Sequence, residues 1–200
     1  MKTLFTFLLM IFLVGSAVAV VDPDPNSLGI YFDLNADVTY LDVAPDTEFR
    51  AYVILTNPTF GFVKGIEFGY ESVVPAGMEG MLFRLATIIP PHECCPIFPY
   101  FLKGDYIFGL TPPLPTSAAT VLVEWLFMTL APMTIEYHLG PSSAPSLPDG
   151  FPVVMNENDE LISLGISSGD VTVPVAEVNT GHQPVVAESA TWGGVKSLYR

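Results

Sequence analysis

The clearest pattern of hydrophobic and polar positions lies between Asp46 and Tyr70. Every second residue of its first half belongs to one apolar set: Phe49, Ala51, Val53 and Leu55. This period of two predicts a strand with one face in a core. Pro58 interrupts the pattern, because proline has no N–H to donate to a β-ladder. A second alternating run places Ile66, Phe68 and Tyr70 on one face, so we expect two neighbouring antiparallel strands.

Short β-prone runs continue on both sides of this stretch. Turn signals recur roughly every 8 to 15 residues, and no helical stripe is long enough for a bundle. The pattern predicts about eight to ten strands between Leu28 and Val173. The expected fold class is all-β, a single immunoglobulin-like or jelly-roll β-sandwich over residues 28–174.

Five segments of this domain carry individual predictions. The run Met81–Ile89 fits either a strand or a short helix, because short apolar runs match both periods. Tyr100–Leu110 is expected to form a hairpin, and Thr111–Ser117 a proline-rich connector. Ala118–Leu130 is the most apolar run and predicts a central strand buried on both faces. Val171–Val173 is expected to close the sandwich.

The N-terminus has the organisation of a secretory signal peptide. Lys2 precedes an apolar run over Leu4–Val14, and small residues then end in Ala17-Val18-Ala19. The apolar run is shorter than the ~20 residues that a membrane-spanning helix needs. We expect residues 1–19 to be a signal peptide cleaved before Val20, with an extended lead-in over 20–27 and no later membrane span.

Charge narrows the range of partners. The chain has 7 basic and 21 acidic side chains, a formal net charge of -14 at pH 7. Such a surface repels nucleic acid and disfavours anionic lipid. Half of the residues are hydrophobic, which is enough for a full core.

The end of the chain changes in character. Residues 175–191 are polar and small without a period, and predict a linker. Residues 192–200 then form a flexible tail with aromatic, apolar and basic side chains suited to recognition: Trp192, Lys196, Leu198 and Tyr199. Two interpretations stay open, an ordinary frayed terminus and a short sorting or docking tag.

Metal binding is not expected from the cysteines. Cys94 and Cys95, with His92 nearby, fall short of the four ligands of structural zinc. Three alternatives stay open for the two thiols: a vicinal disulfide, two free buried thiols, or a link to another chain. The acidic run Asn156–Glu160 could offer oxygens to calcium, but Leu161 stands where a calcium loop needs glycine, so a solvated turn is expected and no cofactor.

No catalytic constellation emerges. His92, His138 and His182 lie far apart in the sequence, without a spacing typical of catalysis. Glu67 and Glu71 are the carboxylate pair to consider for glycoside hydrolysis, but nothing in the sequence places them in a cleft. The sequence therefore predicts no enzymatic activity.

Three segments resemble the cohesin-like secreted β-sandwiches, which are related in architecture to carbohydrate-binding modules. Phe49–Pro58 resembles the early strand of that family, which ends in a threonine-asparagine connection. Gly65–Val74 resembles the next strand, and Ser168–Val173 resembles the closing one. The resemblance covers about Leu28–Val173 and implies a single-domain sandwich with a binding role.

The expected function is that of an exported, non-catalytic structural or protein-interaction module, secreted or at the cell surface. Its partner would be a cell-surface protein. The alternative is a carbohydrate-binding module, in which Tyr100 and Tyr106 would stack on sugar rings. The sequence does not identify the ligand.

Overall fold

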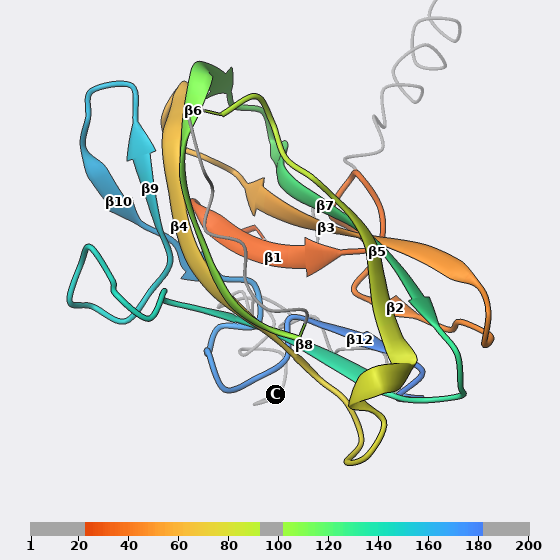
Figure 1. Cartoon of the computed structure of the whole chain (residues 1–200). Coiled ribbons are helices and arrows are strands. Elements are labelled where there is room, and N and C mark those ends of the chain that lie inside the picture. Colours follow the sequence, from red (N-terminus) through yellow and green to blue (C-terminus); the bar gives the residue numbers. More distant parts are fainter. Residues whose placement is uncertain (1–22, 93–101, 182–200) are drawn as a thin grey trace, which may run out of the picture.

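The computed structural model describes residues 23–92 and 102–181. Within these ranges the chain forms twelve β-strands and one short 3-10 helix, Glu79–Met81. The strands make two sheets that pack face to face (Figure 1), which confirms the predicted all-β sandwich. No helix in the described ranges is long and apolar enough to cross a membrane.

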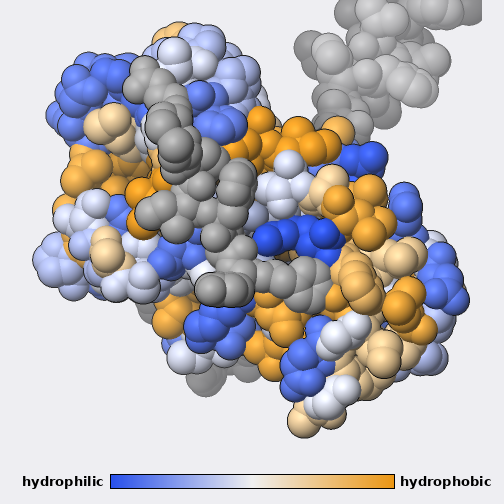
Figure 2. All heavy atoms as spheres, viewed as in Figure 1, coloured by the Kyte–Doolittle hydropathy of each residue, from blue (hydrophilic) through white to orange (hydrophobic). Residues whose placement is uncertain are grey.

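The first sheet has five strands in the spatial order β11-β1-β3-β7-β5. Their bounds are β1 Ser27–Tyr31, β3 Glu48–Thr56, β5 Leu82–Ile88, β7 Ala119–Thr129 and β11 Gly165–Ile166. β1 and β11 are parallel, and all other neighbours are antiparallel. Among the described strands β5 pairs with β7 alone and forms one edge, where Figure 2 shows hydrophobic residues on the right of the molecule.

The second sheet has seven strands. Their bounds are β2 Tyr40–Leu41, β4 Phe62–Val73, β6 Lys103–Pro115, β8 Ile135–Gly140, β9 Val153–Asn156, β10 Leu161–Ser163 and β12 Ala176–Val178. β4 is central, because it pairs with β6 on one side and with both β8 and β9 on the other. β10 extends the sheet beyond β9, and β12 and β2 extend it beyond β8.

Burial follows the predicted alternation on the two long strands. The four alternating apolar residues of β3 are buried in the core: Phe49, Ala51, Val53 and Leu55. Ile66, Phe68 and Tyr70 of β4 join the same core from the second sheet. The core therefore lies between the two sheets, as the period of two requires.

A polar aromatic cluster fills part of this core, and it corrects one prediction. Tyr106 is fully buried and stacks on Phe68, with 4.9 Å between the ring centroids. Its hydroxyl accepts hydrogen bonds from Trp125 Nε1 at 2.7 Å and from Arg84 at 3.2 Å. Arg84 also donates to the Tyr70 hydroxyl. The prediction that Tyr106 faces a ligand is wrong, because its ring and its hydroxyl both serve the core.

The prediction that β3 and β4 are neighbours is also wrong. β3 pairs with β1 and β7 in the first sheet, whereas β4 lies in the second. The irregular connection between them carries Asn57, with φ at 47°, and Phe60, which is buried. This connection crosses from one sheet to the other instead of folding back as a hairpin.

β6 and β7 differ from their predictions as well. β6 is one continuous strand from Lys103 to Pro115, so the predicted hairpin is absent and most of the predicted proline connector belongs to the strand. The strand accommodates its prolines because they lie where the ladder bulges: Gly109 pairs with Gly65, but Leu114 pairs with Val63. Along β7, buried and half-buried residues alternate over most of the strand, so it is not buried on both faces. The run Met81–Ile89 forms strand β5 after the short 3-10 helix.

The end of the domain lies further along the chain than predicted. Residues 171–173 form an exposed turn, in which Thr172 N donates to Asp170 Oδ1 at 2.8 Å, and they do not form the closing strand. The closing strand is β12, which follows buried Val175 and pairs with β8 and β2. The predicted linker is therefore wrong at its beginning, and residues 182–191 lie outside the described ranges.

Candidate functional site

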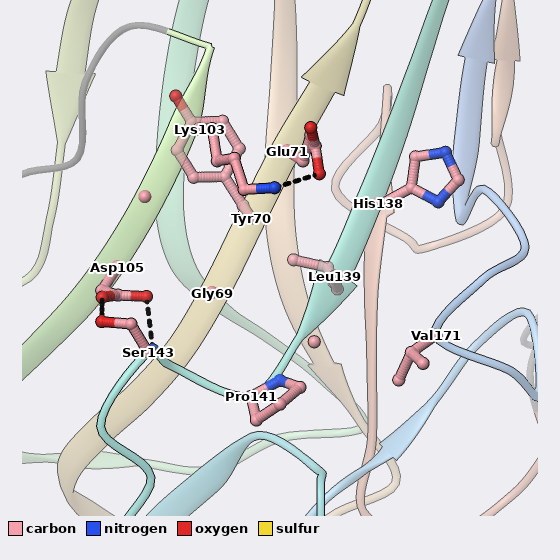
Figure 3. Close-up of a pocket in the computed structure, with 12 residues that line it drawn as sticks. Gly69, Tyr70, Glu71, Lys103, Asp105, His138, Leu139, Pro141, Ser143 and Val171 are labelled. Atoms are coloured by element: carbon pink, nitrogen blue, oxygen red, sulfur yellow. Dashed lines mark hydrogen bonds and ion pairs between the residues drawn. The ribbon is translucent and has the colours of Figure 1, made fainter.

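Two depressions lie on the outer face of the second sheet. The first has a volume of about 470 Å³ and is lined by β4, β6, β8, the segment after β8, and Val171 (Figure 3). The second has a volume of about 240 Å³ and is lined by β4, β6 and β9, with Leu161 of β10. Both are shallow features of one sheet surface, and β4 and β6 run through both.

Glycines shape this surface. The outward positions of β4 alternate glycine with glutamate, in the order Gly65, Glu67, Gly69 and Glu71. A Cβ atom at Gly69 would lie 2.4 Å from the carbonyl oxygen of Pro141, so only glycine lets the segment after β8 approach the strand this closely. The face therefore presents backbone as well as side chains.

The loop between β8 and β9 is fastened across this face, and residue 67 is its main anchor. Glu67 is only 8% exposed. Its carboxylate accepts hydrogen bonds from Ser142 Oγ at 2.8 Å and Ser146 N at 2.9 Å, and a third from the Ser146 hydroxyl. Ser143 N donates to Asp105 Oδ1 at 3.0 Å. Because Glu67 lies between the glycines that line each depression, the fastened loop separates the two.

The first depression has a mixed rim of charges. Lys103 Nζ lies 2.8 Å from Glu71 Oε2, and both side chains are well exposed. His138 of β8 stands opposite Glu71 in the ladder, and its Nε2 lies 3.7 Å from Glu136 Oε2. Exposed ion pairs contribute only about 0–1 kcal/mol. Breaking the pair so that Lys103 and Glu71 can bind groups of a partner therefore costs little free energy.

Comparisons with known proteins agree with this architecture. No protein-family model matches the chain, and no curated protein matches it. Among solved structures, the sixth cohesin of scaffoldin B from Acetivibrio cellulolyticus, in complex with a dockerin, has a TM-score of 0.52 and 10% identity over 78% of this chain and 99% of that chain. A type II cohesin from the cellulosome of the same organism has a TM-score of 0.51 and 14% identity over 78% and 96%.

A third structure is a type I cohesin–dockerin complex from Clostridium thermocellum, with a TM-score of 0.50 and 9% identity over 78% of this chain and 98% of that chain. The chain has a cohesin-like fold. The resemblance expected from the strand patterns is thus confirmed at the level of fold.

Among the residues that the structure describes, the candidate catalytic side chains of this cohesin-like domain do not form a common site, because each contacts other residues of the fold. Glu67 is held by the loop and Glu71 by Lys103, so the two carboxylates do not face a shared cleft. The ring of His92 packs against Phe108 in the middle of β6, with 5.9 Å between the centroids. Across residues 23–92 and 102–181, no three His, Cys, Asp or Glu side chains cluster as metal ligands.

The acidic turn between β9 and β10 serves the fold. Asn156 Oδ1 accepts from the backbone N–H groups of Asn158 and Glu160, at 2.9 and 3.0 Å. The Glu157 carboxylate accepts from the N–H groups of Gly61 and Phe62, both at 3.1 Å. Its own N–H and these two lower the pKa of Glu157. The turn thus fastens the start of β4, a role that the acidic run alone did not reveal. The expectation of a solvated turn without calcium stays a prediction.

Several residues singled out in the sequence lie outside the described ranges, so the structure does not place them. They are the two thiols of the possible vicinal disulfide and five predicted recognition residues: Cys94, Cys95, Tyr100, Trp192, Lys196, Leu198 and Tyr199. The predictions made for them stay predictions.

Proposed function

We propose that this cohesin-like chain is a non-catalytic protein-interaction module that binds a partner protein through the outer face of its second sheet. The observation that carries the proposal is the glycine-lined surface with two depressions on either side of a fastened loop. Two solved structures of similar fold are cohesins in complex with dockerins, which supports a protein as the partner. The signal peptide predicted over residues 1–19 supports a place outside the cell or at its surface.

A glycan partner is less well supported by this face. Sugar rings stack on exposed aromatic rings, but the outward positions of β4 from Gly65 to Glu71 carry only glycine and glutamate. Tyr70 and Tyr106, on the neighbouring strands β4 and β6, place their rings in the core.

The test fills the depressions from positions that tolerate a side chain. A Cβ atom at Gly140 meets nothing within 4 Å, and one at Gly109 meets only the Lys64 carbonyl oxygen at 3.8 Å. Gly140→Arg and Gly109→Arg should therefore fold normally and obstruct one depression each. Gly80→Arg, in the 3-10 helix and also in open space, is the matched control.

The immobilised chain is first used to capture surface proteins of the source organism, and the purified captured protein is then titrated against each variant. We expect both face variants to weaken binding at least tenfold, about 1.4 kcal/mol, and Gly80→Arg to bind like the parent. Equal affinity of all three variants would place the binding surface elsewhere.

A further inference from the structure

An exposed apolar surface lies on the opposite sheet, along its β5 edge. We call it the β5–β7 patch and define it by residues on or beside these strands: Met81, Phe83, Leu85, Ile88, Leu126, Met128 and Leu130. Leu85 and Ile88 are 45% and 52% exposed. The ladder makes the patch contiguous, because Phe83 stands opposite Met128. Figure 2 shows hydrophobic residues gathered over β5.

A contiguous exposed apolar patch indicates a binding site. Single exposed apolar residues are ordinary, but contiguous ones mark interaction sites. Edge strands are kept from associating by charged side chains, by bulges, or by a helix or loop that covers them. The one charged residue of β5, Arg84, points into the core, where it donates to the hydroxyls of Tyr70 and Tyr106.

The surroundings of the patch favour a basic occupant. Glu48 stands opposite Met128 in the ladder, and Glu79 lies two residues before Met81. Arg50, opposite Leu126, is paired with Glu124, so the rim keeps an excess of negative charge. The basic residues in the described ranges are already engaged: Arg50 with Glu124, Lys64 with Asp159, Lys103 with Glu71, and Arg84 with the two tyrosines. An occupant that complements the acidic rim must therefore bring its own cations.

Residues 192–200 of the same chain have this chemistry. The segment reads WGGVKSLYR, with four apolar or aromatic side chains, Lys196 and Arg200, and no acidic residue. The chain leaves β12 at the end of the sandwich where the patch begins. There the Asn179 side-chain amide donates to the Met133 carbonyl oxygen at 3.1 Å. Met133 is three residues beyond Leu130, a reach of at most ~11 Å. The eleven steps along the chain from Gly181 to Trp192 span up to roughly 36 Å, which is enough to reach the patch.

We propose that residues 192–200 dock intramolecularly on the β5–β7 patch. Trp192 and Leu198 cover the apolar side chains, and Lys196 and Arg200 face the acidic rim. The tail then covers an edge strand whose one charged side chain, Arg84, faces the core. In this arrangement the tail is ordered on its own domain and needs no separate partner.

Tryptophan fluorescence tests the proposal in the full chain, because the two tryptophans are Trp125, which is fully buried, and Trp192. The Trp192→Phe chain isolates the Trp125 signal, and a peptide of residues 188–200 gives the unprotected reference for acrylamide quenching. The patch variant is Leu85→Glu with Ile88→Glu. Val73→Glu is the matched control, since Val73 is 42% exposed on β4 of the other sheet.

We expect Trp192 in the parent to be quenched less than in the peptide, and the patch variant to lose this protection while Val73→Glu keeps it. Lys196→Glu with Arg200→Glu should also reduce the protection of Trp192. This double variant changes only the tail, so it tests the proposal even if the patch variant does not fold. The proposal is overturned if the parent is quenched like the peptide, or if the folded variants stay protected. It is also overturned if protection disappears on dilution together with a dimer mass in sedimentation, which would assign the patch to a second copy.

Discussion

Replacing Glu67 removes the anchor of the loop that separates the two depressions. Three hydrogen bonds to a carboxylate are worth about 1.5–3 kcal/mol each before the freed groups are considered. Released Ser142 and Ser146 donors return to water, and each freed loop residue regains about 1–2 kcal/mol of backbone entropy. We therefore expect Glu67→Ala to lower the free energy of unfolding by about 3 kcal/mol.

Glu71→Ala is the matched control, because Glu71 lies on the same strand and face but only in an exposed ion pair with Lys103. Its effect should stay below about 1 kcal/mol. Glu67→Gln keeps an acceptor oxygen and should fall between the two. The measurement is urea denaturation, supported by hydrogen exchange at the Ser146 amide, which should accelerate in Glu67→Ala alone.

A loss of about 3 kcal/mol corresponds to a fall of roughly 6–12 °C in Tm for a domain of this size. If Glu67→Ala and Glu71→Ala differ by less than about 0.5 kcal/mol, the loop is held by other contacts and the anchor role assigned to Glu67 is wrong.

Two further predictions concern the aromatic core. Tyr106→Phe removes the oxygen that accepts from Trp125 Nε1 and Arg84, and should cost about 2 kcal/mol in urea denaturation; unchanged stability would contradict the role of this hydroxyl. Burial raises the pKa of Tyr70, Tyr106 and Tyr137 in the folded protein. Their contribution to folding stability is therefore complete below the tyrosine pKa of the unfolded chain, near 10, and is lost as pH rises above it. Stability should fall by up to about 1.4 kcal/mol per pH unit for each tyrosine, and a flat profile from pH 9 to 11.5 would refute this.

The sequence was informative where one face of a strand must enter the core. Phe49 of β3 and Phe68 of β4 each stand in a run of period two, and both face inward. The partner of each strand was not predictable, because the connection around Pro58 is compatible with a turn back or a crossing between sheets. β12 has three residues, Ala176–Val178, which is too short for a period to be recognised.

The site was less predictable, because its features depend on contacts between distant segments. The loop over residues 140–152 could be predicted as a loop, but its anchor at Glu67 is set by the approach of Pro141 to Gly69. Residue type alone suggests a ligand-facing role for Tyr106. Its parity with Phe108 and Leu110 carries the correct signal, since these three alternate positions form one apolar face.

The two proposed surfaces lie on the outer faces of opposite sheets, with the whole core between them. Gly140, in the first depression, and Leu85, in the β5–β7 patch, share no strand and no described contact. Substitutions at such independent sites have additive effects. A docked tail would therefore leave the partner-binding face open, and the patch variant should bind the captured partner with parental affinity even when Trp192 has lost its protection. A change in that affinity would mean that the tail reaches the partner, as a docking tag would.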